Sequence, residues 1–309
     1  MVGSKSLKFA TLDVFTSSAF QGNQLAIVNL PGNINLEQDT KQRIAREFNF
    51  SETVFIHDPT SDNEDRRVDI FTLTQELPFA GHPVIGTLCH LCQVSDPPLR
   101  KVNLSLKAGT LVGRYDPETR LAEAEIPHDV RLHQARAPRD ILDCQLNTLP
   151  AGNQWPNEFP VVSVVKGMTF VLIAMPDLAA LSSLDPLNQK GVHEQDKLDE
   201  GWQSSFMAPY YYTITEQTPS LIRIRSRMME PTVGEDPCTG SAASTLAAYL
   251  ALEHGQPGRT YAYSIEQGVE MGRAGEIHVK VTLGQSRGIE KLVLAGSAVL
   301  MTQGVLYLP

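Results

Sequence analysis

Two segments of the chain, one in each half, pass from strand-like sequence through a turn rich in Gly and Pro into an apolar helix. The first is ELPFAGHPVIGT, residues 76–87, and the second is PTVGEDPCTGSAASTLAAYLALEHG, residues 231–255. One plan used twice predicts two similar domains, each with strands and one apolar helix. The same pattern also fits two unrelated α+β domains.

The length and composition set limits that agree with two globular domains. A chain of 309 residues allows about two domains of ordinary size, and 42% hydrophobic with 20% charged residues is typical of globular proteins. Residues 128–158 lack clear periodicity, which predicts a domain boundary near this stretch. The net charge of −9 argues against nucleic acid as a partner, because binding phosphate backbones needs a basic surface.

The chain shows no targeting or membrane-spanning segment. Its start has no apolar stretch long enough for a signal peptide. The most apolar run, residues 161–175, is interrupted by Lys166 and Gly167 and is too short to span a bilayer, so it predicts two buried strands joined by a turn. Four scattered cysteines are typical of a reducing compartment. We expect a cytoplasmic protein without a membrane partner.

Residue patterns predict the other elements. Residues 35–48 carry an apolar stripe between charged residues, which predicts a surface helix with Asn35 as its cap. Alternating or β-branched residues predict strands in the segments 9–15, 51–59, 66–80, 101–116, 119–127, 208–215, 221–230, 276–284 and 291–309.

The turns before the two apolar helices have features of anion-binding sites. If Pro83 begins the first helix, backbone N–H groups near Gly81 are unsatisfied donors at the positive end of the helix dipole. The second helix offers the same groups around Gly240. A single helix start of this kind is more often structural. Two of them converging on one cleft would bind a carboxylate or another anion.

Carboxylates stand beside these turns. Glu52 lies between Ser51 and Thr53 where a loop becomes a strand, and Asp236 follows Glu235 just before the second helix. A carboxylate in a closed apolar cleft has a raised pKa, so it can take and return a proton near neutral pH. The alternative is structural: Ser51 caps a turn and Asp236 caps the helix.

Signals for metals and cofactors are weak. Cys89, His90 and Cys92 have metal-ligand spacing, but no second pair of ligands completes a site, so we expect them in a core. The chain contains no phosphate-binding loop, no dinucleotide-binding fingerprint and no nucleophile elbow. We therefore predict neither a metal nor an organic cofactor.

Four motifs together resemble the phenazine biosynthesis isomerase (PhzF-like) family. They are GNQLAIV, NFSETVFI, ELPFAGHPVIGT and GEDPCTGSAA, and they occur in the order found in that family. The likeness extends from DVFTSSAFQGNQ to the closing LAGSAVLMTQGVLYL.

The resemblance implies the diaminopimelate epimerase-like fold, an α+β architecture of two similar domains. Each domain would be a mainly antiparallel curled sheet around a central helix, with the active site in the cleft between them. The last strands would return to the first domain, so the expected domains are residues 1–127 with 292–309, and residues 128–291. A homodimer is also implied.

The resemblance also implies a reaction and its residues. The family's enzymes shift a proton on a small carboxylic acid without a cofactor, and Glu52 would be the general acid and base. The remaining expected site residues divide into those assisting the proton transfer, His82 and Asp236, and those binding the substrate, Ser51, Gly81, Gly240 and Ser241.

One departure from the family keeps other functions open. Cys238 lies where the phenazine enzymes usually have a small residue, and related racemases use two facing cysteines. The first motif has no Cys, so a Cys238-dependent racemase is disfavoured, although a thiol near a helix start can have a lowered pKa. A protein that binds a small acid without turnover is the other alternative, since fold and motif do not prove activity.

Overall fold

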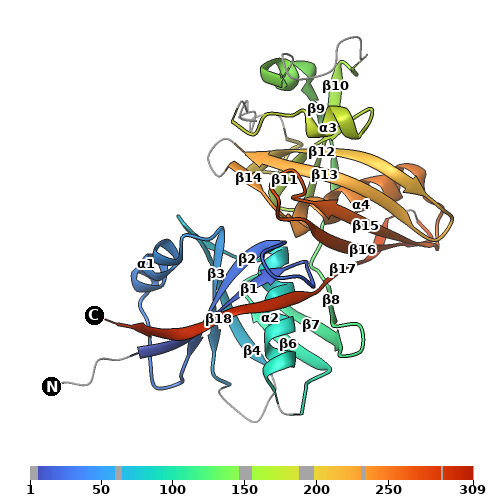
Figure 1. Cartoon of the computed structure of the whole chain (residues 1–309). Coiled ribbons are helices and arrows are strands. Elements are labelled where there is room, and N and C mark those ends of the chain that lie inside the picture. Colours follow the sequence, from blue (N-terminus) through green and yellow to red (C-terminus); the bar gives the residue numbers. More distant parts are fainter. Residues whose placement is uncertain are drawn as a thin grey trace. The chain divides into compact units, whose positions relative to one another are not determined.

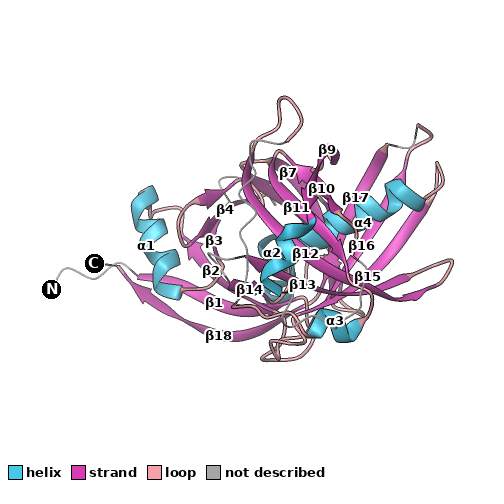
Figure 2. Ribbon diagram, turned by 90° about the horizontal axis from the view of Figure 1, so that it is seen from above, coloured by secondary structure: helices cyan, strands magenta, loops and turns pink. Residues whose placement is uncertain are grey.

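A computed structural model describes residues 6–59, 65–95, 97–145, 155–187, 198–230, 234–286 and 288–308. The chain divides into two compact units: unit 1 is residues 1–126 with 294–309, and unit 2 is residues 127–293. Strands predominate in both units and helices are few, as Figure 2 shows. This confirms the predicted α+β class.

Unit 1 contains a mainly antiparallel sheet. Its strands follow the order β18, β1, β2, β3, β4, β6, β7, β8, with β2–β3 and β4–β6 parallel and the other neighbours antiparallel. The short strand β5 pairs with β4 just before a helix. The strand bounds are β1 Ser6–Val14, β2 Asn23–Leu30, β3 Glu52–His57, β4 Arg66–Thr72, β5 Glu76–Leu77, β6 Lys101–Leu106, β7 Gly109–Asp116, β8 Leu121–Glu125 and β18 Ala298–Tyr307.

Helix α2, Gly81–Val94, is the core of unit 1. It contacts β1, β2, β3, β6, β7, β8 and β18, and Figure 1 shows it in cyan among these strands. A helix that is apolar on all sides must be buried, which explains why the segment has this composition. Gly86 permits the close approach, since a Cβ there would lie 2.5 Å from Cδ2 of Leu25.

Helix α1, Gln38–Phe48, packs on β3 and β4 and buries Lys41, Ile44 and Ala45. The predicted cap at Asn35 is wrong. The helix begins after Glu37, whose extended backbone carbonyl accepts the N–H groups of Thr40 and Lys41, and no side chain caps it. The first turn is thus closed by backbone hydrogen bonds alone.

Unit 2 repeats this architecture. Its strands follow the order β9, β10, β11, β12, β13, β15, β16, with β11–β12 and β13–β15 parallel, and short β14 pairs with β13. Helix α4, Gly240–His254, contacts β10, β11, β15 and β16. The other bounds are β9 Arg131–Pro138, η1 Arg139–Gln145, β10 Glu158–Val165, β11 Gly167–Ala174, α3 Leu178–Ser182, β12 Ser204–Gln217, β13 Ile222–Glu230, β14 Gly234–Asp236, β15 Thr260–Gln267, β16 Gly275–Leu283 and β17 Ile289–Gly296.

The two units share one topology, which confirms the pseudo-repeat predicted from the sequence. Matching elements occur in the same order and with the same parallel or antiparallel pairing. The pairs are β1 with β10, β2 with β11, α1 with α3, β3 with β12, β4 with β13, β5 with β14, α2 with α4, β6 with β15, and β7 with β16.

Two predictions near the start of unit 2 have different outcomes. Residues 161–175 do form two antiparallel strands, β10 and β11, joined by a turn at Lys166. Gly167, the first residue of β11, has a φ of 91°, which suits glycine. The prediction of an irregular stretch over residues 128–158 is wrong in part, because residues 131–138 form β9, which pairs with β10. Within the described ranges, no helix is long and apolar enough to cross a membrane.

Candidate active site

The turn before each central helix has the same construction in both units. Leu77 pairs with Ile70 at the end of β5, and Asp236 pairs with Met228 at the end of β14. Each is followed by Pro, two further residues and a Gly that begins the helix. His82 and Ser241 are consequently equivalent, as the second residues of α2 and α4.

Helix α2 begins at Gly81, two residues earlier than the predicted start at Pro83. Ala80 is extended, with φ −151° and ψ 141°, and its carbonyl accepts the N–H of Val84 at 3.3 Å. Pro83 is tolerated in the first turn because the N–H groups there have no intrahelical partner. The backbone N–H of Gly81 therefore lies at the positive end of the helix dipole.

Glu52 lies beside this helix start. It is the first residue of β3, and its Oε2 lies 3.6 Å from Nε2 of His82. Its side chain is 16% exposed, so it is largely desolvated but still reachable. Burial raises the pKa of Glu52 to about 7, and a hydrogen bond with Ser51 opposes part of this shift. The carboxyl therefore changes protonation state near neutral pH.

Asn23 connects the other members of this group. Its Nδ2 lies 3.5 Å from Nδ1 of His82, and its Oδ1 accepts a hydrogen bond from Ser51 at 3.5 Å. If the amide donates to Nδ1, neutral His82 carries its proton on Nε2, which faces Glu52. Asn23 belongs to the GNQLAIV motif, but the sequence alone did not predict a role for it. Its available signal was the Gly-Asn turn before a buried strand.

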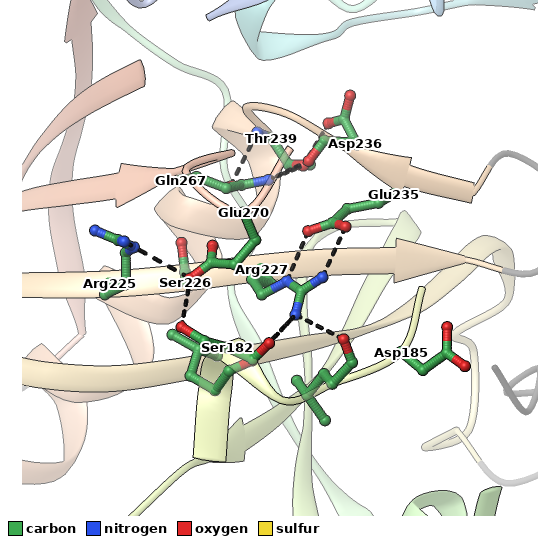
Figure 3. A network of polar contacts seen from close by, with 12 residues as sticks. Ser182, Asp185, Arg225, Ser226, Arg227, Glu235, Asp236, Thr239, Gln267 and Glu270 are labelled. Carbon is green, nitrogen blue, oxygen red and sulfur yellow. Dashed lines mark hydrogen bonds and ion pairs between the residues drawn. The ribbon is translucent and has the colours of Figure 1, made fainter. Parts of the chain in front are cut away.

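In unit 2, Asp236 is held at the end of β14. The Thr239 hydroxyl donates a hydrogen bond to the Asp236 carboxylate. Gln267, at the end of β15, donates from Nε2 to the Asp236 carbonyl at 2.8 Å and to the Thr239 hydroxyl at 3.0 Å. Figure 3 shows Gln267, Thr239 and Asp236 side by side. The predicted cap by Asp236 is replaced by this arrangement, since Thr239 precedes α4 and no side chain caps it.

Glu235, which the sequence analysis considered together with Asp236, has a structural partner. Both of its carboxylate oxygens accept hydrogen bonds from Arg227, at 2.7 and 2.9 Å, as Figure 3 shows. The remaining Nη1 of Arg227 donates to backbone carbonyls, of which Leu184 is the nearest at 2.8 Å. This buried bidentate pair stabilises the position of β14. Glu235 therefore has a structural role, and Asp236 is the carboxylate next to the start of α4.

The other predicted residues of unit 2 lie at the helix start. Gly240 is the first residue of α4, and Ser241 is the second. The Cys238 thiol is fully buried, and burial raises its pKa well above the ordinary value, with the charge of Asp236 as a further cause. The lowered pKa considered in the sequence analysis is therefore wrong for this thiol.

The predicted site residues thus form two groups, one in each unit. Ser51, Glu52, Gly81 and His82 gather in unit 1, and Asp236, Gly240 and Ser241 gather in unit 2. Among the described residues, no cluster of three or more His, Cys, Asp or Glu side chains is arranged to hold a metal ion. Cys89, His90 and Cys92 are buried in α2, as expected.

Comparison with known proteins identifies the family. The model of the phenazine biosynthesis-like protein family (PhzC-PhzF) matches residues 12–304. The chain belongs to this family. A trans-2,3-dihydro-3-hydroxyanthranilate isomerase of Pseudomonas chlororaphis is 30% identical over 302 residues, which cover 97% of this chain and 99% of that protein. The chain is accordingly a PhzF-family isomerase.

A further relative and two solved structures are also similar to the chain. An uncharacterized isomerase of Mesorhizobium japonicum is 31% identical, covering 96% of this chain and 97% of that protein. A PhzF-family protein of Bacillus anthracis superposes with a TM-score of 0.77 at 20% identity, covering 98% of this chain and 100% of that one. A hydroxyproline epimerase of Agrobacterium vitis gives 0.60 at 13% identity, covering 100% and 94%. These likenesses confirm the epimerase-like fold.

Proposed function

We propose that this PhzF-family isomerase moves a proton between two carbons of a small carboxylic acid, with Glu52 as both base and acid. The observation that carries the proposal is the environment of Glu52: a largely buried carboxyl with a pKa of about 7, 3.6 Å from His82. A group whose pKa lies near the working pH can both accept a proton and give it back.

The proposed reaction is balanced within one residue and one substrate. Ionised Glu52 takes a proton from a carbon of the substrate, and the electron pair of that C–H bond shifts into the neighbouring unsaturated system. Protonated Glu52 then delivers the proton to a second carbon, which restores the carboxylate. No cofactor is needed for this sequence, because the unsaturated acid itself holds the electron pair between the two steps.

His82 and the helix starts would assist. Nε2–H of His82, fixed by Asn23, can donate a hydrogen bond to charge that develops on Glu52 or on the substrate. Gly81 and Gly240 are the first residues of α2 and α4. At each helix start, the backbone N–H groups and the helix dipole favour binding of a carboxylate. Ser51 in unit 1, and Ser241 and Asp236 in unit 2, are proposed as further substrate-binding residues.

The name of one relative supports a proposal for the substrate class. The Pseudomonas chlororaphis relative is named for trans-2,3-dihydro-3-hydroxyanthranilate, a small cyclic unsaturated acid. We propose that this chain acts on that compound or on a small unsaturated acid of the same kind. The Cys238 racemase is disfavoured, because a buried thiol with a raised pKa is a poor base at neutral pH.

The test is deuterium incorporation in heavy water, followed by NMR. Wild type and Glu52→Gln are incubated with trans-2,3-dihydro-3-hydroxyanthranilate and a panel of small unsaturated, hydroxy and amino acids. We expect deuterium to enter a carbon of one compound with wild type and not with Glu52→Gln. Equal exchange with both proteins would refute the role of Glu52. Calorimetric binding of an acid that never exchanges would favour a binding protein instead.

Glu76→Gln is a matched control for Glu52→Gln. Glu76 is also a buried carboxylate of unit 1, where it accepts hydrogen bonds from Lys107 at 2.5 Å and Gln38 at 2.6 Å. It occupies a structural position equivalent to that of Glu235 in unit 2. The same change of carboxylate to amide should lower stability there without abolishing exchange.

A further inference from the structure

A polar network in unit 2 connects the half-buried Asp236 to side chains buried behind it. Its members, here called the Gln267 network, are Ser226, Tyr210, Gln267, Thr239 and Asp236. Its members come from four strands, β12, β13, β14 and β15, and from the residue before α4, and the Gln267 amide lies at the centre of the chain of hydrogen bonds. Burying so many polar groups is costly unless every one of them is satisfied.

The amide of Gln267 uses its whole hydrogen-bonding capacity. Nε2 donates to the Asp236 carbonyl at 2.8 Å and to the Thr239 hydroxyl at 3.0 Å. Oε1 accepts from the Thr239 backbone N–H at 3.2 Å and from the Tyr210 hydroxyl at 3.1 Å. Two donors and two acceptors are the complete inventory of a Gln side chain. Rotating the amide by 180° would set donor against donor, so its orientation is settled.

The network has a direction that ends on Asp236. Tyr210 gives its only hydroxyl proton to Gln267, so Ser226 must donate to Tyr210 at 2.8 Å. Thr239 receives a proton from Gln267 and therefore directs its own to the Asp236 carboxylate. The chain of donors runs from Ser226 through Tyr210, Gln267 and Thr239 to the Asp236 carboxylate, which accepts the last hydrogen bond.

The neighbouring titratable groups do not compete for this role. Burial raises the pKa of Tyr210, and Asp236 adds to that shift, so the phenol stays protonated. Burial likewise raises the pKa of Cys238, with Asp236 raising it further and Arg273 opposing both. Tyr210 and Cys238 therefore remain neutral near neutral pH.

Unit 1 shows that the fold does not need this network. The row of paired residues Tyr210, Met228 and Asp236 in unit 2 corresponds to the row Val54, Ile70 and Leu77 in unit 1. By the same register, Val68 replaces Ser226, Leu106 replaces Gln267 and Ala80 replaces Thr239.

All five equivalents in unit 1 are apolar. Val54, Val68, Ala80 and Leu106 are buried in its core. The same topology is thus built once with an apolar core and once with a polar chain at matching positions. Since the apolar version suffices for folding, the polar version serves Asp236.

We propose that Gln267 and Thr239 are positioning residues that orient the Asp236 carboxylate for the isomerase reaction. Asp236 would touch the substrate, and the two residues act through it. This inference rests on the proposed function for its kinetic readout, but the state of the Asp236 carboxyl can be measured without turnover.

Thr239 offers the sharpest variants. Thr239→Val has nearly the same shape and removes the hydroxyl, and it removes no helix cap because Thr239 makes none with its side chain. Thr239→Ser restores the donor. We expect Thr239→Val to lower kcat/KM for trans-2,3-dihydro-3-hydroxyanthranilate by roughly 10-fold to 100-fold, the effect of losing a hydrogen bond to a charged group, and Thr239→Ser to stay close to wild type.

Carboxyl NMR gives the readout that a merely structural role would not change. In protein labelled with ¹³C at Asp side chains, the Asp236 signal is assigned with Asp236→Asn and titrated. Loss of the Thr239 donor destabilises the charged carboxylate, so its titration should move to higher pH in Thr239→Val and not in Thr239→Ser.

A gradient along the network separates positioning from stability. Gln267→Met breaks four hydrogen bonds and should lower the free energy of unfolding more than any other variant in the series. Thr239→Val should lower the free energy of unfolding less, but should lower kcat/KM more relative to that loss. Gln145→Met is the matched control. Gln145 is a fully buried amide that bridges the backbone of Asp185 at 2.9 and 2.8 Å, outside the network. It should lose stability with little change in kcat/KM.

The outcomes are distinguishable. An unchanged Asp236 titration in Thr239→Val overturns the inference, whatever the activity. If Glu52→Gln is inactive but Thr239→Val matches wild type in kcat/KM, the proposed function stands and the positioning role falls. The proposed function fails if wild type does not act on trans-2,3-dihydro-3-hydroxyanthranilate, or if Glu52→Gln is as active as wild type. In that case the titration of the Asp236 carboxyl alone decides whether Thr239 donates its hydroxyl proton to Asp236.

Discussion

Nε2 of His82 lies 3.6 Å from Oε2 of Glu52, and both atoms are buried. The carboxyl has a pKa of about 7 because burial disfavours its charged form. An imidazole N–H at this distance can close on the carboxylate or on a substrate when a ligand enters. The relationship joins a strand start to a helix start that lie far apart in the sequence.

The first prediction concerns the pH dependence of turnover. Proton abstraction requires ionised Glu52, so kcat/KM should rise with pH and level off above a midpoint near 7, the value to which burial raises its pKa. The measurement is kcat/KM for trans-2,3-dihydro-3-hydroxyanthranilate from pH 5 to 9. A midpoint near the ordinary Glu value of 4.5 would contradict the assignment.

The second prediction is that Glu52→Gln stabilises the protein at alkaline pH. The folded state keeps a proton that unfolded Glu52 releases between the ordinary value of 4.5 and about 7, so wild-type stability falls as pH rises through this window. The variant lacks this penalty. Above pH 7 it should be more stable by up to about 3 kcal/mol, and the difference should vanish near pH 4. Urea unfolding at both pH values checks the sign.

The third prediction concerns the tautomer of His82. Asn23→Leu removes the amide that faces Nδ1 at 3.5 Å, so the proton is no longer confined to Nε2. Activity should fall by roughly 10-fold to 100-fold, as when one preorganised donor is lost. Long-range ¹⁵N–¹H NMR of the imidazole should show an Nε2–H tautomer in wild type and a mixture in the variant. An unchanged tautomer would mean that Asn23 does not set it.

The fourth prediction is that Cys238 is dispensable for chemistry. Its thiol is fully buried and its pKa is raised, so thiol reagents should leave the native protein active. Cys238→Ala should keep its kcat and lose about 1 kcal/mol of stability through the small cavity created. Rapid inactivation by iodoacetamide that bound substrate prevents would instead favour the alternative of a Cys238-dependent racemase.

The fifth prediction concerns the anchor of β14. Arg227→Met leaves Glu235 buried without its cation and should cost about 3–5 kcal/mol of stability. The double variant Arg227→Met/Glu235→Leu should recover part of this loss, because no uncompensated charge remains. Unfolding midpoints of the two variants provide the comparison. If the double variant is less stable than Arg227→Met, the stability loss of the single variant does not come from leaving Glu235 as an unpaired buried charge.

Much of the fold was predictable from local patterns. The apolar helices α2 and α4, the strands β10 and β11, and the repetition of one plan all follow from residue periodicity and from the Gly and Pro positions. Strand β9 was missed because the residues on its buried side, His133, Ala135 and Ala137, are small or polar and do not stand out as an apolar alternation in the sequence. Asn35 was mistaken for a cap because several polar residues precede α1, and propensity does not choose among them.

The sequence by itself determined which residue types stand at the two helix starts and that Glu52 adjoins a strand. Tertiary structure alone decided that Glu52 is desolvated, that Glu235 is paired with Arg227, and that Gln267 supports Thr239 from 28 positions away. The physical reason is that protonation and hydrogen bonding depend on groups brought together by sheet register. Residues adjacent in the chain, such as Glu235 and Asp236, point to different partners in a strand.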